Sequence, residues 1–288
     1  MSDKNYSLIN FNSSPEVTNN LIEKISAAIG WIALHETPKR IALSTFIDDI
    51  KQSNYDPLIK AAMISNANRI IKEYTNQRDI VALASQNISN AEGIKKLEND
   101  WLAQFMDSVK DVSNDEFKKV WALILAAEGN APGSVPKSLF YILQKMDKMD
   151  AQTFTKFSSM VIRIWGEATP FIWNEFYASN PKERGIYCES GVSFEEINQL
   201  ETLGLIKIRN DVFGSGFIVS DDGLNEPREI RYFGHYLAIP DTVKNIRVGS
   251  VLFTKDGKAL YEAINAVEMS GFWDGFVVSR IQSDEGWK

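Results

Sequence analysis

The sequence predicts a mainly α-helical protein, with an N-terminal multi-helix bundle followed by an α+β module of winged-helix type. Apolar residues recur at spacings of three and four through most of the first 165 residues, which is the pattern of amphipathic helices. After Pro170, glycines and strand-forming residues become more frequent and the candidate helices become short. We therefore expect a flexible arm over 1–15, a helical domain over 16–170 and a winged-helix-like α+β domain over 186–288.

The first helices are indicated by apolar stripes and bounded by prolines. The first stripe ends before Pro38, because the residue that precedes a proline avoids helical geometry. Pro57 suits the first turn of a later helix, where its missing N–H costs nothing. We expect helices over 16–34, 39–51, 57–74 and 92–110, with a short one ending at Ala84.

The following helices are joined by a turn that the sequence specifies closely. Ser113–Glu116 has the spacing of a capping box, and Gly129 is a candidate left-handed stop. Pro132-Gly133 predicts the turn, after which Ser134 can cap the next helix. Asp150 is expected to cap one more helix, with a buried face made of Phe154, Phe157, Val161, Ile164 and Trp165.

The second half alternates short helices with strands. Ser193–Glu196 is another capping box, and Gly204 is expected to end the helix that it opens. Thr254 is expected to cap a helix over 255–267. Strands are expected at 205–208, 216–220, 229–239, 248–253 and 276–281.

The winged-helix arrangement itself raises the question of DNA binding. A DNA-reading helix before the wing needs basic or amide side chains that face the groove. Here that helix carries Glu195, Glu196 and Glu201, with only Asn198 and Gln199 as potential base readers. Carboxylates repel phosphates, so this composition favours a scaffold or a protein contact over DNA reading.

Residue types that carry catalysis or bind metals are scarce. The two histidines, His35 and His235, lack zinc-site spacing, and Cys188 is the only cysteine. The pairs Asp48-Asp49 and Asp221-Asp222 have no further acidic partner nearby in the sequence and are interpreted as solvated charges. We therefore expect no cofactor and no metal, and the sequence leans away from an enzyme without deciding the question.

Two further positions have competing interpretations. Glu128 lies in a last helical turn, where the helix dipole disfavours an anion, so a partner is expected. A clamp on the Pro132-Gly133-Ser134 turn is favoured over a functional site. Trp31, together with Ile29 and Ile32, could anchor a partner or a membrane surface, although core packing is the favoured interpretation for the tryptophan.

Charge and hydropathy bear on partners and localisation. The net charge of −7 disfavours binding to nucleic acid, which requires a basic face. Near the N-terminus the most apolar stretch, residues 25–34, is about half of the roughly 20 residues that cross a bilayer. The start lacks the basic and apolar regions of a secretory signal. We expect a cytoplasmic protein without a transmembrane segment, with peripheral membrane contact as an alternative.

The segment from Trp121 through Glu128 to Pro132-Gly133-Ser134 carries a family resemblance. It resembles an uncharacterised bacterial family of unknown function that shares a Trp-Ala-x-x-Leu-Ala-x-Glu…Pro-Gly-Ser segment. The similarity covers about residues 20–165 and continues more thinly over 203–206. The family offers no reaction or catalytic residues to carry over. Its loose link to abortive-infection genes implies a role in phage defence.

These observations predict a cytoplasmic, non-enzymatic interaction protein that serves as a sensor or effector in bacterial phage defence. Its expected partner is a protein, either a second copy or a different chain. Two alternatives from other classes stay open. One is a winged-helix transcriptional regulator, and the other is a nuclease-type toxin whose site is not visible in the sequence.

Overall fold

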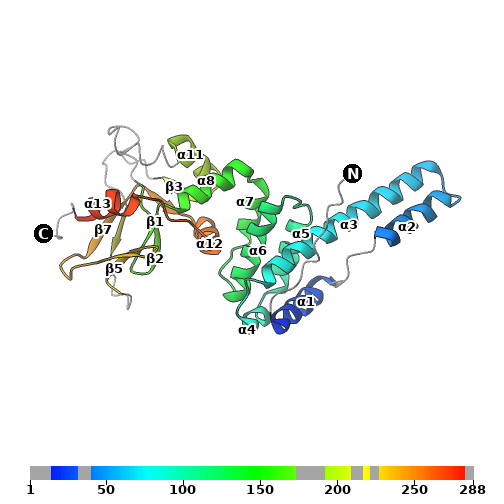
Figure 1. Ribbon diagram of the computed structural model, residues 1–288, viewed down its shortest axis with the longest axis horizontal. Helices are drawn as coiled ribbons and strands as arrows, with labels where there is room; N and C mark the ends of the chain where they lie inside the picture. The colour runs from blue at the N-terminus through cyan, green and yellow to red at the C-terminus, as the bar shows by residue number, and fades with distance from the viewer. Residues whose placement is uncertain (1–13, 32–39, 173–191, 209–216, 221–226, 283–288) are drawn as a thin grey trace. The chain divides into compact units, whose positions relative to one another are not determined.

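The computed structural model describes residues 14–31, 40–172, 192–208, 217–220 and 227–282 (Figure 1). The chain divides into two compact units, Met1–Phe140 and Tyr141–Lys288. The described residues are mainly helical and include small antiparallel sheets, which confirms the predicted mainly α character. The winged-helix type and the predicted domain boundaries stay predictions.

The described part of the first unit is built from helices. They are α1 (Pro15–Ile29), α2 (Arg40–Gln52), α3 (Pro57–Ser85), α4 (Ala91–Lys95), α5 (Asn99–Val109) and α6 (Asp115–Asn130), while α7 (Ser138–Lys145) spans the boundary between the units. Helix α3 packs against α6, and α1 packs against α4 and α5. The core between these helices includes Leu21, Ile25, Ile80, Leu102, Phe105, Trp121, Ile124 and Leu125.

Three of the predicted helix boundaries are wrong. Helix α1 ends at Ile29, not at 34, because Gly30 adopts φ 70° and its N–H donates to the Ser26 carbonyl over 2.7 Å. The helices predicted separately through 57–84 form one helix, α3, since nothing after Pro57 interrupts its backbone. Conversely, the helix predicted over 92–110 is divided into α4 and α5.

Helix α6 departs from the prediction at both ends. Its N-cap is Asn114, not Ser113, and the Asn114 side chain accepts from the N–H groups of Glu116 and Phe117. Gly129 lies inside the helix and does not stop it. A Cβ on Gly93 of α4 would lie 2.2 Å from the Gly129 carbonyl, so these two helices approach closely at glycines.

The described part of the second unit combines short helices with three small antiparallel sheets. One sheet has the strand order β2-β1-β5-β6, and β3 pairs with β8 and β4 with β7. The helices are α8 (Lys148–Ser158), α11 (Phe194–Thr202), α12 (Lys255–Ala263), the π-helical turn η1 (Trp273–Val277) and α13 (Val278–Gln282). The strands are β1 (Val161–Ile164), β2 (Glu167–Pro170), β3 (Ile206–Ile208), β4 (Phe217–Ser220), β5 (Glu229–Tyr232), β6 (His235–Ala238), β7 (Asn245–Gly249) and β8 (Val251–Phe253).

The helix predicted to bury Val161, Ile164 and Trp165 stops earlier. Helix α8 ends at Ser158, and Val161–Ile164 is strand β1, in agreement with its three β-branched residues. Trp165 and Gly166 both have positive φ, 47° and 80°, which is the two-residue turn that joins twisted strands. The cap of α8 is Asp147, and Asp150 is the third residue of its capping box.

The local signals of the second half agree better with the structure. Ser193 forms the predicted capping box, Gly204 has φ 84° just after α11, and Thr254 caps α12. The long strand predicted over 229–239 is the hairpin β5–β6. The strand predicted over 276–281 is wrong, because these residues are helical and bury Phe276, Val277 and Ile281 at helical spacing.

Candidate functional site

Glu128 binds the turn that follows its own helix. Its carboxylate oxygens accept hydrogen bonds from the backbone N–H groups of Gly133, over 2.6 Å, and Val135, over 2.8 Å. The side chain is only 3% exposed, so these two amides take the place of water. Gly133 has φ 86°, a left-handed conformation that suits glycine. The carboxylate therefore fixes the path of the chain between α6 and α7.

The neighbours of this turn are aromatic and buried. Trp121 packs against Phe105 and Phe140, with ring centroids 5.7 and 5.8 Å apart. Trp101 donates its indole N–H to the Val135 carbonyl over 2.9 Å. The predicted capping role of Ser134 is wrong, because α7 starts at Ser138 and the Ser134 hydroxyl donates to the Ala127 carbonyl. These contacts give the segment a structural role.

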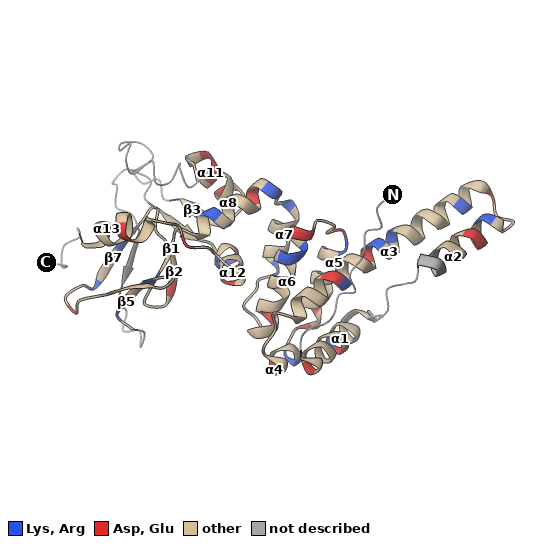
Figure 2. Cartoon of the chain, viewed as in Figure 1, with Lys and Arg blue, Asp and Glu red and all other residues tan. Residues whose placement is uncertain are grey.

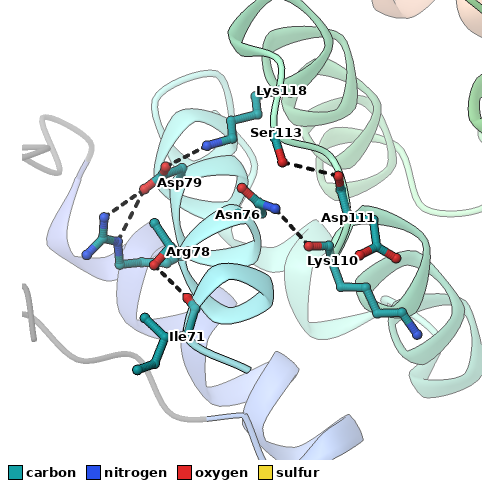
Figure 3. A network of polar contacts seen from close by, with 9 residues as sticks. Ile71, Asn76, Arg78, Asp79, Lys110, Asp111, Ser113 and Lys118 are labelled. Atoms are coloured by element: carbon teal, nitrogen blue, oxygen red, sulfur yellow. Dashed lines mark hydrogen bonds and ion pairs between the residues drawn. The ribbon is translucent and has the colours of Figure 1, made fainter. Parts of the chain in front are cut away.

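Polar side chains anchor the C-terminal half of α3 to its neighbours (Figure 3). Asp79 accepts from Lys118 of α6 and from Arg78, each over 2.8 Å. Lys118 is 7% exposed, so this ion pair is largely withdrawn from water. Asn76 donates to the Lys110 carbonyl at the end of α5 over 2.8 Å. This half of α3 is thus held by charge and hydrogen bonds as well as by packing.

Replacing Asp79 with Asn should destabilise the chain by about 2 kcal/mol, because the buried Lys118 ammonium then lacks a carboxylate. The measurement is the free energy of unfolding from denaturant titration. Asp107→Asn is the matched control, since its partner Lys110 is exposed and the pair should contribute less than about 1 kcal/mol. Equal losses in the two variants would contradict the prediction.

The N-terminal half of α3 and the neighbouring α2 present an exposed apolar surface. We call it the hairpin face and define it by Phe46, Ile59, Met63 and Ile70, which are 49, 49, 36 and 51% exposed. Leu58 and Tyr55, at the tip between the helices, are also exposed. Lys60 donates to the Lys51 carbonyl over 2.8 Å, which ties the two helices together near the tip. Figure 1 shows α2 running alongside this part of α3.

The contact residues predicted at the end of α1 differ in how far they are exposed to solvent. Trp31 is 8% exposed and stacks on Tyr74 of α3 with ring centroids 5.7 Å apart. Ile29 is 39% exposed, and Ile32 lies outside the described residues. Trp31 is therefore packed against α3 in the first unit, and the contact predicted for these residues stays a prediction.

In the second unit, a single threonine joins the end of α11 to the start of α12. The Thr254 hydroxyl donates to the Gly204 carbonyl over 2.7 Å and accepts from the Gly257 N–H over 3.0 Å. Gly257 lies so close to strand β3 that a Cβ there would be 1.8 Å from the Leu205 carbonyl oxygen. Residues 203–206, after α11, and residues 254–257, at the start of α12, are thus held together by Thr254.

A surface cavity of about 460 Å³ lies between α8 and α11. Its lining includes the carboxylates of Asp150 and Glu196, both of which already have partners. Asp150 accepts from Gln199 over 3.1 Å and from the Asp147 N–H, and Glu196 accepts from the Ser193 N–H over 2.5 Å. These two carboxylates are thus engaged in capping boxes, and the cavity is also lined by Glu195 in the first turn of α11.

His235 and Tyr232 pair across the β5–β6 turn beside η1. The His235 ring lies 2.9 Å from a Glu268 carboxylate oxygen and stacks on Trp273. The buried Tyr232 hydroxyl donates to the Ser159 carbonyl over 2.8 Å and accepts from the Met269 N–H over 2.7 Å. These hydrogen bonds hold β5 to the residues around Ser159 and Met269, so Tyr232 has a structural role.

Replacing Tyr232 with Phe should cost about 1–2 kcal/mol of folding stability, since the Ser159 carbonyl and the Met269 amide lose a buried partner. The measurement is again denaturant unfolding. Tyr236→Phe provides the control, because Tyr236 is 73% exposed and its hydroxyl remains in water. A loss as large in the Tyr236 variant would refute the assignment.

The same tyrosine predicts a dependence of stability on alkaline pH. Burial raises the pKa of Tyr232 from 10 to about 12. Between these values the unfolded chain has released the proton and the folded chain retains it, so stability falls as the pH rises from 10 to 12. We expect the Tyr232→Phe variant to show a smaller fall over this range. The comparison needs unfolding curves for both chains at several pH values.

Several residues discussed from the sequence are not placed by the structure. His35, Cys188 and the Asp221-Asp222 pair lie outside the described residues. Asp48 is exposed and forms an ion pair with Lys51 over 3.3 Å. Among the described residues, no group of three or more His, Cys, Asp or Glu side chains is arranged to hold a metal ion. Nor does any helix described here have the length and apolarity to span a membrane.

Sequence reasoning missed the hairpin face. The sequence predicted only two helices there, over 39–51 and 57–74, without an exposed face. A signal was available, because the apolar residues of 57–71 occupy more of the helix circumference than one neighbouring helix can cover. Leu58, at 77% exposure, lies outside the hairpin face.

The fold and these surfaces define a helical protein with a small α+β unit, whose most distinctive exposed feature is apolar. The family described as "Protein of unknown function (DUF2806)" matches residues 66–275. This match covers well over half of the chain, and the chain belongs to that family. No curated protein and no solved structure matches it.

Proposed function

We propose that this chain is a non-enzymatic interaction protein and that the hairpin face is its main protein-binding surface. The observation that carries the proposal is the clustering of exposed large apolar side chains between Phe46 and Ile70. Exposed apolar residues scattered singly need no explanation, but a group on one element marks an interaction site. Six such residues, Phe46, Tyr55, Leu58, Ile59, Met63 and Ile70, belong to this short segment.

The acidic side chains of α11 in the second unit favour a protein partner over nucleic acid. Figure 2 shows α11 with acidic residues and without Lys or Arg. Glu196 is engaged in the capping box of α11, and Glu201 accepts from the Ile208 N–H over 2.7 Å. These carboxylates are fixed on the helix that would have to face DNA. The net charge of −7 adds to the repulsion.

We further propose that the second unit is a winged-helix-type scaffold. Its support is that β3, the strand after α11, pairs antiparallel with β8, the strand before α12, while β4 to β7 lie between them in the chain. The Thr254 junction holds the strand pair to both helices. Because the reading helix is acidic, this scaffold serves protein contact. The alternative of a transcriptional regulator would require a basic face, which α11 does not provide.

A role as a sensor or effector in bacterial phage defence is the biological setting we propose. It is supported by the resemblance of the Trp121–Ser134 segment to a family loosely linked to abortive-infection genes. A cytoplasmic location fits that setting. The hairpin face would then bind a protein that either signals infection or responds to it.

The test is co-purification of the tagged chain from bacterial cells, with and without phage infection. The chain with both Ile59→Asp and Ile70→Asp should lose its specific protein partner at least tenfold, since a charge on the apolar face opposes association. Val267→Asp is the control, because Val267 is 68% exposed outside the hairpin face. Partner recovery that is unchanged in the double variant would refute the proposal, as would nucleic-acid hydrolysis by the purified chain.

A further inference from the structure

We infer that the hairpin face binds the same face of a second copy of this chain, so that two α2–α3 hairpins form an antiparallel four-helix bundle. This inference rests on the proposed function, because it names the partner of the proposed binding surface. Two-fold symmetry is the commonest arrangement of soluble oligomers and requires a surface that is complementary to itself. The spacing, side-chain sizes and area of the hairpin face each meet that requirement.

The apolar residues of α3 form a narrow stripe. Ile59, Met63 and Ile70 lie within about 40° of one another around the helix, given a rotation of roughly 100° per residue. With Asn66 between them, their spacings are four, three and four, which is the repeat of helices that pack along a shared seam. The stripe lies about a quarter turn away from Ile64, Ala67 and Ile71, which are half-buried.

Helix α2 extends the same face. The turn at residues 53–56 reverses the chain, so position 46 on α2 lies level with position 63 on α3. The helical rotation of α2, measured from the buried Ile50, directs the exposed Phe46 to the side on which Met63 lies. The face therefore contains side chains from both helices, as a four-helix arrangement requires.

An antiparallel two-fold pairing satisfies this stripe. It places Ile59 opposite Ile70 of the second copy and Met63 opposite Asn66 of the second copy. The small Ala62 and Ala67 flank the stripe and allow close approach of the helices. Arg69 donates to Asn66 over 2.8 Å and to Glu73 over 2.6 Å, so the guanidinium beside the seam already has a carboxylate partner. A single polar Asn within an apolar seam is a feature that fixes register.

The exposed area is of the size that such a dimer needs. At roughly 100 Å² for each half-exposed side chain, the four residues of the hairpin face leave about 400 Å² of apolar surface uncovered. A standard interface buries about 800 Å² per partner, of which a little over half, roughly 450 Å², is apolar. The hairpin face therefore supplies most of the apolar area of a standard interface, and polar side chains around it must supply the rest of the buried surface.

The first test is the mass of the purified full chain in solution, measured by light scattering and sedimentation equilibrium. We expect twice the chain mass of 32.5 kDa. The Ile59→Asp and Ile70→Asp double variant should weaken dimerisation at least 100-fold, and Val267→Asp should leave it unchanged. Circular dichroism establishes that each variant is folded. A native chain that is monomeric at tens of micromolar overturns the inference.

The second test addresses geometry, after Cys188, the only cysteine, is replaced by Ser. In the antiparallel pairing, position 59 faces position 70 and lies about 16 Å along the helix from its own copy, too far for a disulfide. Mixing Ile59→Cys chains with Ile70→Cys chains should give a mixed disulfide dimer in excess over either homodimer. Homodimers of the Ile59→Cys chain in excess would overturn the antiparallel pairing.

Combined with the co-purification experiment, these tests separate the two proposals. A monomeric chain whose double variant loses a different protein would overturn the second-copy inference and leave the proposed function standing. A monomeric chain whose double variant keeps all its partners would overturn both. A dimer that depends on Ile59 and Ile70 supports both.

Discussion

Replacing Gly257 with Ala should destabilise the chain by about 3–4 kcal/mol, although alanine is the better helix former. In an open helical position this substitution gains up to about 1 kcal/mol. Here the new Cβ would lie 1.8 Å from the Leu205 carbonyl oxygen and 2.7 Å from its carbon. Both atoms are backbone, so no rotamer change relieves the contact, and α12 or β3 must shift.

The measurement is denaturant unfolding, with a second readout at the junction itself. A shift of α12 would also lengthen the hydrogen bonds of Thr254 to Gly204 and Gly257, so faster amide exchange is expected at Gly257. Gly275→Ala is the control, because a Cβ there meets no atom within 4 Å. If the Gly257 variant were as stable as the Gly275 variant, the close approach of α12 to β3 would be refuted.

Replacing Glu128 with Gln should cost about 3 kcal/mol, even though the two side chains have nearly the same shape. The carboxylate offers two acceptor oxygens to two backbone donors, the N–H groups of Gly133 and Val135. Glutamine supplies one acceptor and one amide donor, so one N–H then faces another N–H in a buried site. The loss combines a charged hydrogen bond with an unsatisfied donor.

Thermal and denaturant unfolding of the Glu128→Gln chain measure this cost. Glu98→Gln is the control, since Glu98 is exposed and makes no side-chain cap to α5. We also expect faster amide exchange at Val135 in the Glu128 variant, because that N–H loses its acceptor. Normal stability with unchanged exchange would show that the turn holds without the carboxylate.

Signals contained within a few residues were readable from the sequence. The Ser193 capping box, the left-handed Gly204 and the Thr254 cap were predicted because each depends on neighbours within four positions. The β1–β2 hairpin was missed because Val161 and Ile164 also continue the apolar period of α8. Only its pairing with β2 and β5 decides the strand conformation, and that pairing is not local.

The residues of the candidate site also divide into those predicted from local signals and those that depend on distant contacts. A partner for Glu128 was expected from its unfavourable position in the helix dipole, and the structure places two amides there. The hairpin face was harder to predict. Apolar periodicity shows that one side of a helix is apolar, but it does not show whether a neighbouring helix covers that side. Ile59 and Ile70 are exposed because no third described element covers them on the N-terminal half of α3.

Helix α3 carries both the hairpin face and the Asp79–Lys118 ion pair, and nothing breaks its 29 residues. At about 1.5 Å per residue it is a strut of roughly 44 Å without a hinge. Ile59 and Asp79 therefore lie on one continuous helix, and Asp79 joins that helix to α6 through its ion pair with Lys118. A protein bound to the hairpin face, as we propose, would therefore contact the same unbroken helix that the Asp79–Lys118 ion pair holds to α6.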